Sequence, residues 1–342
     1  MSAQGRRLPA EWERHAACWT AWPTHRHAWG ERLGAAQRQA AAFMRAVAAQ
    51  PGGERLRVLR SHVDGDAMAQ GAADVACDAI DDIPYGDVWL RDTGPVFVHG
   101  GADADAVVFG FDGWGGKYRY EHDEAVGEAV ARRAGAAIER EPFVLEGGAI
   151  ECDGDGTLLT TRSCLLDPVR NPGVQQAQVE KMLARRLGAR RVLWLGRGLS
   201  GDHTDGHVDN LARFVGRRRV LCARPGGASD PNADVLGDIE TQLREARDAD
   251  DEPLSVQTLP SVGLVADAEG APMAASYLNF YVGNAAVIVP AFGRPSDATA
   301  AGVIAGCFPD RRVVSLPADA LLTGGGTFHC ISRQQPAHLP HG

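Results

Sequence analysis

Four short segments of the sequence place ionisable side chains beside glycines, and together they supply a thiol, an imidazole and several carboxylates. The segments are YGDVWLRDTGP with Asp87 and Asp92, LEGGAIE with Glu146, GDHTDGHVDN with His207 and Asp209, and GGGTFHC with Cys330. A cysteine with a separate histidine is typical of covalent catalysis, because a thiolate is a strong nucleophile and an imidazole transfers protons near neutral pH. The set therefore indicates a cysteine-dependent enzyme.

The number of carboxylates indicates the charge of the substrate. A cysteine hydrolase that acts on a neutral amide orients its histidine with one Asn or Asp and gains nothing from several anions. A guanidinium group would use them, since it is planar and cationic and binds carboxylates through paired N–H donors. The formal net charge of −9 also favours a cationic ligand and argues against a nucleic-acid surface. We therefore expect a small cationic guanidino substrate.

Other interpretations of these residues stay open at this point. A cysteine considered alone is more often a buried structural residue than a nucleophile. His203 and His207 have the i, i+4 spacing of a metal site on a helix, but Gly206 argues against a helix there, so we expect no metal. His329 directly precedes Cys330 on an expected strand. Because neighbours on a strand point to opposite faces, a structural role is favoured for His329. Glu11 is expected to be solvated or to cap a helix.

Five stretches have helical periodicity, and each is followed by a run rich in β-branched and aliphatic residues that is typical of a strand. The expected helices cover residues 31–50, 122–135, 174–187, 233–247 and 295–307. The runs after them are RLRVLR, AIEREPFVL, RRVLWLG, LSVQTLP and RRVVSLP. Four of the five units are then followed by one of the polar segments above.

The regular spacing of these units allows two α/β folds. An open doubly wound sheet gives the same alternation, whereas a fivefold repeat around one axis would bring the polar segments to a single central site. We favour the repeat because the polar residues recur at the same place in each unit. No linker divides the sequence, so one domain over residues 1–342 is expected.

The remaining features are those of an ordinary globular protein. The first residues lack the apolar run of a secretory leader, and no stretch of eighteen apolar residues occurs, so we expect a cytoplasmic protein with no membrane partner. Seven scattered cysteines without a C-x-x-C pair fit neither a disulfide framework nor a zinc ribbon. Of the tryptophans near the start, Trp12, Trp19 and Trp22 are expected equally in the core and in a pocket wall.

The ordered motifs resemble those of the agmatine deiminases, within the guanidino-group-modifying pentein superfamily. The resemblance rests on LPAEWERHAACWTAWP, VWLRDTGP, FDGWGGKY, LEGGAIE, CLLDPVRNPG, HTDGHVDNLARF, ASYLNFYVGNAAVIVP and GGGTFHCISRQQP, which run over nearly the whole chain. It implies a five-bladed α/β propeller with pseudo-fivefold symmetry of ββαβ-type units. It also implies a homodimer as a possible assembly and no cofactor. The family more often has GGGNIHC at the end and FNAWGG in the middle, so Thr327 and Phe328 are departures here.

The resemblance further implies a role for each candidate residue. Cys330 resembles the nucleophile, His207 the general acid and base, and Glu146 its carboxylate partner. Asp92 and Asp209 resemble the pair that clamps the guanidinium group. The residues expected to contact the substrate besides these are Asp87, Trp89, Trp114 and Gly325.

The activity implied is hydrolysis of agmatine to N-carbamoylputrescine and ammonia through a thiouronium on the cysteine, in arginine and polyamine metabolism. The chemistry leaves a deiminase of free or peptidyl arginine as an alternative, since the sequence does not identify what binds the substrate tail. An amidino transferase is a weaker alternative. A guanidine- or polyamine-binding protein without catalysis is the alternative from a different class.

Overall fold

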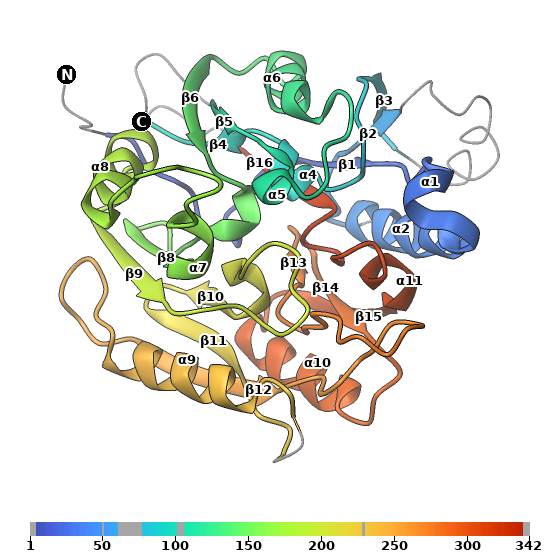
Figure 1. Cartoon of the computed structure of the whole chain (residues 1–342). Coiled ribbons are helices and arrows are strands. Elements are labelled where there is room, and N and C mark those ends of the chain that lie inside the picture. Colours follow the sequence, from blue (N-terminus) through green and yellow to red (C-terminus); the bar gives the residue numbers. More distant parts are fainter. Residues whose placement is uncertain (1–4, 50, 61–76, 101–105, 228–229, 338–342) are drawn as a thin grey trace.

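The computed structural model of the chain contains five small sheets arranged around a common centre (Figure 1). It describes residues 5–49, 51–60, 77–100, 106–227 and 230–337. Five long helices lie around the outside of the ring, whereas the short helix α4 (Leu90–Thr93) lies near its middle (Figure 1). The five-bladed α/β fold expected from the repeat and from the resemblance is therefore confirmed, and the open doubly wound sheet is wrong.

We number the sheets as blades. Blade 1 contains, in spatial order, β16 (Ser332–Pro336), β1 (His15–Ala21), β2 (Leu56–Arg60) and β3 (Ala79–Asp82). Blade 2 contains β4 (Val96–Phe97), β5 (Ala106–Gly110) and β6 (Ile138–Val144). Blade 3 contains β7 (Glu151–Cys152), β8 (Thr157–Thr161) and β9 (Arg191–Leu195). Blade 4 contains β10 (Ala212–Gly216), β11 (Arg219–Arg224) and β12 (Ser255–Pro260), and blade 5 contains β13 (Tyr281–Val282), β14 (Ala286–Ala291) and β15 (Arg312–Pro317).

In each blade, one long helix connects the second strand, in spatial order, to the third, which is parallel to it. In chain order these are α2 (Leu33–Ala48), α6 (Asp123–Arg133), α8 (Gln176–Leu187), α9 (Ala233–Glu245) and α10 (Asp297–Cys307). All five match the helices predicted from periodicity, and the five strands after them match the predicted runs. The short helices are α1 (Arg26–Trp29), α5 (Gly113–Gly116), α7 (Arg162–Leu165) and α11 (Asp319–Leu322), with 3-10 turns η1 (Gly30–Arg32), η2 (Gly147–Ala149) and η3 (Val208–Asn210).

The same pairing pattern recurs in every blade. A short first strand pairs antiparallel with the second strand, which pairs parallel with the third across the helix. A parallel connection needs such a crossover, so the helix is required between exactly those two strands of each unit. In blade 1 the antiparallel partner of β1 is the last strand, β16, with Trp19 opposite Arg333. The end of the chain therefore closes the ring against its beginning.

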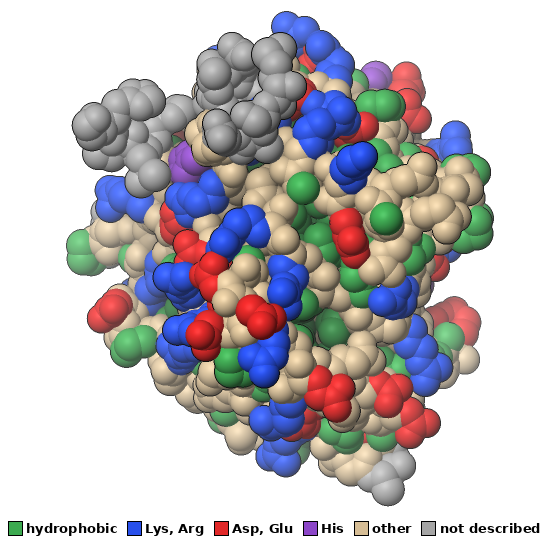
Figure 2. Space-filling view, turned by 90° about the vertical axis from the view of Figure 1, so that its left-hand side faces the viewer, with side chains coloured by type: hydrophobic (Ala, Val, Ile, Leu, Met, Phe, Trp, Pro, Cys, Tyr) green, Lys and Arg blue, Asp and Glu red, His purple; other side chains and the backbone are tan. Residues whose placement is uncertain are grey.

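The hydrophobic core lies between the blades and the helices that cover them. Trp19 and Trp22 are almost fully buried in it, and Trp12 packs partly buried at its edge, so these tryptophans are core residues and none lines the cavity described below. Figure 2 shows the side of the molecule on which α8 lies, where basic and acidic side chains are interspersed. Arg185 and Arg186 of α8, for example, both contact Glu141 of β6. Within the described residues, no helix is long and apolar enough to cross a membrane.

Candidate active site

The segment that precedes the first strand of each blade brings a polar side chain to the centre of the ring. In order of blades 2, 3, 4, 5 and 1, these side chains are Asp92 before β4, Glu146 before β7, His207 and Asp209 before β10, Asn279 before β13, and Cys330 before β16. All of them are buried. The structure thus brings together all five residues expected to carry the chemistry. In the sequence they are spread over more than 200 positions, from Asp92 to Cys330.

A cavity of about 170 Å³ opens onto Cys330. All four residues expected to contact the substrate line it, together with Asp92 and Cys330; the other lining residues are Tyr118, Tyr120, His203, Thr204, Thr323 and Gly324. His207, Glu146 and Asp209 are not among its lining residues and lie fully buried beside it. The cavity is therefore a pocket with a nucleophile, two carboxylates and aromatic walls.

The glycines of GGGTFHC make room for the cysteine. A Cβ on Gly326 would lie 2.8 Å from the Cys330 sulfur, and one on Gly324 would lie 2.7 Å from the Trp29 ring. Gly325 has φ of +112°, a conformation that other residues rarely adopt. The tight approach expected from these glycines is thus present. Cys330 itself lies in a turn two residues before β16, rather than at the head of the strand.

Burial and nearby anions control the thiol. Burial raises the pKa of Cys330 well above its usual range, and the carboxylates of Asp209 and Asp92 raise it further. The Oδ2 atom of Asp209 lies 3.9 Å from the sulfur. Asn279 acts in the opposite direction, because its side-chain amide donates a hydrogen bond to the sulfur at 3.1 Å. Without a ligand the sulfur is therefore held as a thiol, and a bound cation would favour the thiolate.

His207 is surrounded by carboxylates. Burial acts to lower its pKa, but Asp92, Glu146 and Asp209 outweigh that effect, so the pKa of His207 lies above its ordinary value. The Nδ1 atom is 3.7 Å from Asp92 Oδ1, and both ring nitrogens are buried without a hydrogen-bond partner among the residues that the structure describes. Such unpaired buried nitrogens are costly in a structural residue but are what a residue needs to transfer protons to a ligand or water.

Glu146 lies beside the imidazole of His207, within 4.8 Å of one of its nitrogens, and is itself held by an arginine. Arg170 donates from Nε to Glu146 Oε1 at 2.7 Å, while Oε2 has no partner among the described residues. Burial raises the pKa of Glu146, and the positive charges of Arg170 and His207 oppose that rise. The position fits the carboxylate partner that the sequence predicted for His207.

Asp92 is oriented by two donors from other segments. Gly148 donates its backbone N–H to Oδ1 at 2.9 Å, and the Trp114 indole donates to Oδ2 at 2.9 Å. Trp114 has φ of +55°, an uncommon value for a bulky residue, which turns its ring toward the carboxylate. Gly148 has no space for a side chain, because a Cβ there would lie 2.6 Å from His207 Nδ1. The glycines of LEGGAIE therefore have the same function as those beside Cys330.

Asp87 and Trp89 form a second oriented pair on the cavity wall. The Trp89 indole donates to Asp87 Oδ2 at 2.8 Å, and the Val88 backbone N–H donates to Oδ1 at 2.8 Å. Burial raises the pKa of Asp87 despite these two donors. The pair supplies a carboxylate and an aromatic ring to the cavity wall.

Two groups of side chains have the composition of a metal site. Their potential ligand atoms lie within 4.8 Å of one another; the groups are Glu146 with Cys164 and His207, and Glu11 with Glu151 and His329. In both groups a guanidinium group already binds the carboxylates. Arg170 contacts Glu146, and Arg213 contacts Glu11 at 2.9 Å and Glu151 at 3.0 Å. A cation at such a place disfavours a second one, so these groups fit a metal poorly. His203 and His207, the pair weighed in the sequence, do not share a group.

Three side chains near the site were missed or misjudged from the sequence. Asn279 was missed because its amide is not ionisable. It stands before the first strand of blade 5, the same place that the other site residues occupy in their blades. Glu11 was expected to be solvated or capping, which is wrong: it is 5% exposed and contacts Arg213 and His329. His329 does not lie on a strand, and its ring binds Asp209 rather than packing on apolar neighbours.

The two departures from the usual motifs affect local packing. Phe328 stacks on Phe43 with ring centroids 5.5 Å apart. Thr327 donates its hydroxyl to Asn279 Oδ1 at 2.7 Å. Nearby, Arg91 lies 3.6 Å from Glu11 and donates to the His329 carbonyl. None of these contacts changes the residues that face the cavity.

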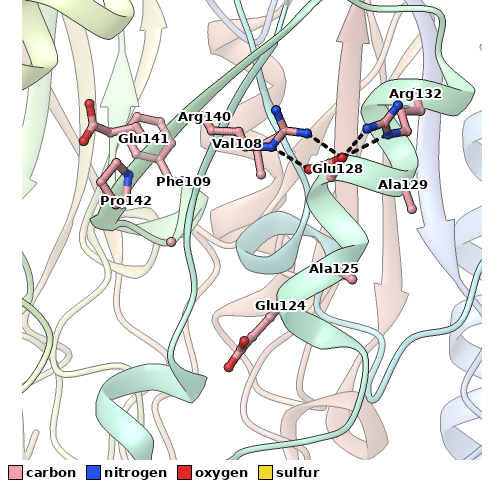
Figure 3. Close-up of a pocket in the computed structure, with 11 residues that line it drawn as sticks. Val108, Phe109, Glu124, Ala125, Glu128, Ala129, Arg132, Arg140, Glu141 and Pro142 are labelled. Carbon is pink, nitrogen blue, oxygen red and sulfur yellow. Dashed lines mark hydrogen bonds and ion pairs between the residues drawn. The ribbon is translucent and has the colours of Figure 1, made fainter.

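A larger hollow of about 740 Å³ lies elsewhere, over β5, α6 and β6 (Figure 3). Figure 3 shows Glu128 between Arg132 and Arg140, paired with both. None of the residues that the sequence singled out for chemistry lines this hollow. Size alone would have selected the wrong place, because this hollow lacks a nucleophile, a histidine and any unpaired buried polar atom among its described lining residues.

Comparison with known proteins gives full-length matches. The family model described as Porphyromonas-type peptidyl-arginine deiminase matches residues 7–336. The agmatine deiminase of Pseudomonas aeruginosa strain LESB58 is 36% identical, with 98% of this chain and 96% of that protein covered. The agmatine deiminase of Stutzerimonas stutzeri strain A1501 is also 36% identical, with 96% and 95% covered. Among solved structures, the agmatine deiminase of Enterococcus faecalis superposes with a TM-score of 0.90 at 28% identity, covering 98% of this chain and 97% of that one.

Proposed function

The chain belongs to the Porphyromonas-type peptidyl-arginine deiminase family, and from that membership and the geometry of its site we propose that it hydrolyses agmatine to N-carbamoylputrescine and ammonia. We propose further that residues 1–342 form a single catalytic domain in which Cys330 is the nucleophile, His207 the acid and base, and Glu146 its partner. Asp92 and Asp209 then hold the guanidinium group.

One observation supports the reaction class above all others. Cys330 and Asp92 line the same cavity, and the buried carboxylate of Asp209 lies 3.9 Å from the Cys330 sulfur. Two carboxylates beside a thiol oppose its ionisation, and that arrangement is useful only if the substrate brings a positive charge. A bound guanidinium neutralises the carboxylates, lowers the pKa of the thiol and presents its carbon to the sulfur.

The first half of the reaction forms the covalent intermediate. The Cys330 thiolate attacks the guanidino carbon, the S–C bond forms, and the π electrons of one C–N bond move to nitrogen. The imidazolium of His207 donates a proton to the amino nitrogen that leaves, and the C–N bond breaks to release ammonia. The carbon remains on the sulfur as a thiouronium. Since Glu146 and Asp92 raise the pKa of His207, they keep the imidazole charged until this transfer.

The second half returns the enzyme to its starting state. His207, now neutral, accepts a proton from water, and the hydroxyl oxygen attacks the thiouronium carbon. The hydroxyl group of the adduct loses its proton to solvent, where that proton converts the released ammonia to ammonium. As the C=O bond forms, the C–S bond breaks, the thiolate leaves with the electron pair, and N-carbamoylputrescine is released. Each step uses groups of this chain and one water molecule, so the scheme requires neither a metal nor an organic cofactor.

The walls of the cavity favour agmatine over arginine. Free arginine carries an α-carboxylate that needs a cationic partner, normally an arginine. No Lys or Arg is present among the described residues that line the cavity. Its aromatic rings, from Trp89, Trp114, Tyr118 and Tyr120, together with Asp87, suit the ammonium group at the end of agmatine.

The direct test compares ammonia release from agmatine, arginine and an arginyl peptide by the purified protein. We expect agmatine to give the highest kcat/KM, with one carbamoylputrescine formed per ammonia, and Cys330→Ala to give none. A higher kcat/KM for arginine or the peptide would replace the proposed substrate. Binding of agmatine without turnover would instead indicate a binding protein, and transfer to an added amine would indicate an amidino transferase.

Mass spectrometry after rapid quenching tests the covalent step separately. We expect a substrate-derived adduct on the peptide that contains Cys330 during turnover, and its loss when agmatine is exhausted. An active enzyme that never shows the adduct would contradict the covalent scheme while leaving the substrate assignment intact.

A further inference from the structure

His329 lies next to the nucleophile in sequence, but its side chain belongs to a different set of contacts. Its Nδ1 is 2.7 Å from Asp209 Oδ2, and its Nε2 is 2.7 Å from Glu11 Oε2. The ring is 1% exposed, so neither contact competes with water. A single turn of the chain thus brings to the centre of the ring both the Cys330 sulfur and the His329 imidazole that binds the carboxylate of Asp209.

Asp209 depends on this contact more than Glu11 does. Among the described residues, His329 is the only hydrogen-bond partner of Asp209 closer than the 3.9 Å contact with the sulfur, and Asp209 Oδ1 is buried with no partner. Glu11 is also held by Arg213 at 2.9 Å and by the backbone N–H of Val282 at 2.8 Å. The loss of His329 would therefore release Asp209 but leave Glu11 fixed.

The second contact fixes the direction of the ring. A histidine held by one nitrogen can still turn about its side-chain bonds, whereas contacts at both nitrogens define the plane and the position of Nδ1. Burial lowers the pKa of His329, as do the nearby charges of Arg213 and Arg91, whereas Glu11 and the hydrogen bond with Asp209 act to raise it. His329 in turn helps to lower the pKa of Asp209, against the effect of burial.

We propose that His329 is a positioning residue: anchored to Glu11 through one ring nitrogen, it holds Asp209 through the other, so that the Asp209 carboxylate stays beside the Cys330 sulfur and faces the guanidinium group. This inference rests on the proposed function, since it assigns Asp209 a guanidinium ligand. It assigns no contact between His329 and the substrate. Loss of the contact between His329 and Asp209 should therefore weaken binding of the cationic substrate more than it slows the chemical step.

Two substitutions of similar size separate the two contacts. The amide nitrogen of Asn lies near the position of histidine Nδ1, so His329→Asn keeps a donor toward Asp209 and loses the contact with Glu11. The amide nitrogen of Gln lies near the position of Nε2, so His329→Gln keeps the contact with Glu11 and leaves Asp209 without its donor. Both remove the imidazole ring, so their difference reports which contact matters.

The experiment measures kcat and KM for agmatine in both variants, and the agmatine Kd by calorimetry of each variant combined with Cys330→Ala. We expect Kd and KM of His329→Gln to exceed those of His329→Asn by roughly tenfold to a hundredfold, the worth of a hydrogen bond to a charged group. The kcat values of the two should agree within a few-fold. Equal Kd values, or weaker binding by His329→Asn, would overturn the proposal.

A third variant covers the case in which neither His329 variant folds. Glu11→Gln removes the charge that anchors the ring but leaves Asp209 and His329 in place, and we expect KM to rise several-fold with kcat changed less than twofold. An unchanged KM would overturn the proposal in the same way. If the wild-type protein itself neither binds nor turns over agmatine, the proposed function fails instead, so the two failures are distinguishable.

Discussion

Replacing Asp209 with Asn should change the reactivity of Cys330 in opposite directions toward neutral and cationic reagents. In the ligand-free protein, the carboxylate lies 3.9 Å from the sulfur and is one of the groups that raise the pKa of the thiol. Its removal makes the thiolate easier to form at any given pH. The same change removes an anion that attracts a guanidinium or amidinium group, so binding of a cation becomes weaker.

The size of the effect follows from the distance. Two unit charges 3.9 Å apart interact by about 4 kcal/mol at an effective dielectric constant of about 20, which corresponds to about three pKa units. The amide dipole and local rearrangement reduce this, so we expect the pKa of the thiol to fall by roughly one to three units. A thiolate of lower pKa is also less nucleophilic, with a Brønsted slope of about 0.4–0.5, which leaves a rate gain of roughly three- to fourfold per unit.

The assay compares chloroacetamide with chloroacetamidine, which share a leaving group and nearly the same size but differ in charge. Alkylation of Cys330 is followed by peptide mass spectrometry between about pH 7 and about pH 9, the range in which thiols begin to ionise. We expect Asp209→Asn to react roughly threefold to fiftyfold faster with the neutral reagent and more slowly with the cation.

The matched control is Glu128→Gln, which removes a carboxylate from the outer helix α6 and should change neither rate. The reasoning is refuted if the neutral reagent reacts no faster with Asp209→Asn than with wild type. It is also refuted if the cationic reagent reacts faster, because the carboxylate would then not attract the substrate.

Three further predictions concern the histidine, the glycines and the closure of the ring. Glu146→Gln removes an anion that raises the pKa of His207, so the limb of the kcat profile on which activity falls with rising pH should move to lower pH. His207→Ala should reduce kcat by about 10²–10⁴-fold. Gly148→Ala should lower kcat about a hundredfold, since its Cβ would lie 2.6 Å from the imidazole, whereas Gly237→Ala, with open space in α9, should keep kcat and raise the free energy of unfolding by about 0.5–1 kcal/mol. Deletion of residues 332–342 removes β16, so thermal unfolding followed by circular dichroism should lose its cooperative transition; an unchanged transition would mean that β1 does not need this partner.

Local patterns predicted most of the fold. The five long helices were found within about two residues at most ends, because each buries one face against its blade and so carries a 3.6-residue period. The five strands after them were found because β-branched and aliphatic residues recur in each of those runs. Three of the five first strands, β4, β7 and β13, are only two residues long and have no period to detect, so nothing marked them in the sequence.

The site was predictable where one residue type limits the chemistry, and less so elsewhere. Cys330 and His207 are rare chemical types next to glycines, so their positions stood out. Asn279 did not, because an amide does not titrate and asparagine is common in turns. Its contact with the sulfur, at 3.1 Å, follows from its place in blade 5, and that place is evident only once the five units are superimposed as blades.

Glu11 and His329 could not have been paired from the sequence at all. They are 318 positions apart, and their carboxylate and imidazole meet because β16 pairs with β1 and so brings the last turn of the chain beside the first segment. Arg213, from blade 4, completes the set from the other side at 2.9 Å. The fold and the site are therefore coupled: the pairing of β16 with β1 that completes blade 1 also brings together Glu11 and His329, which contacts Asp209, the carboxylate proposed to face the substrate. Any change that opens this pairing should weaken binding of the cation before it unfolds the blades, which a rise in KM at denaturant concentrations below the unfolding transition would detect.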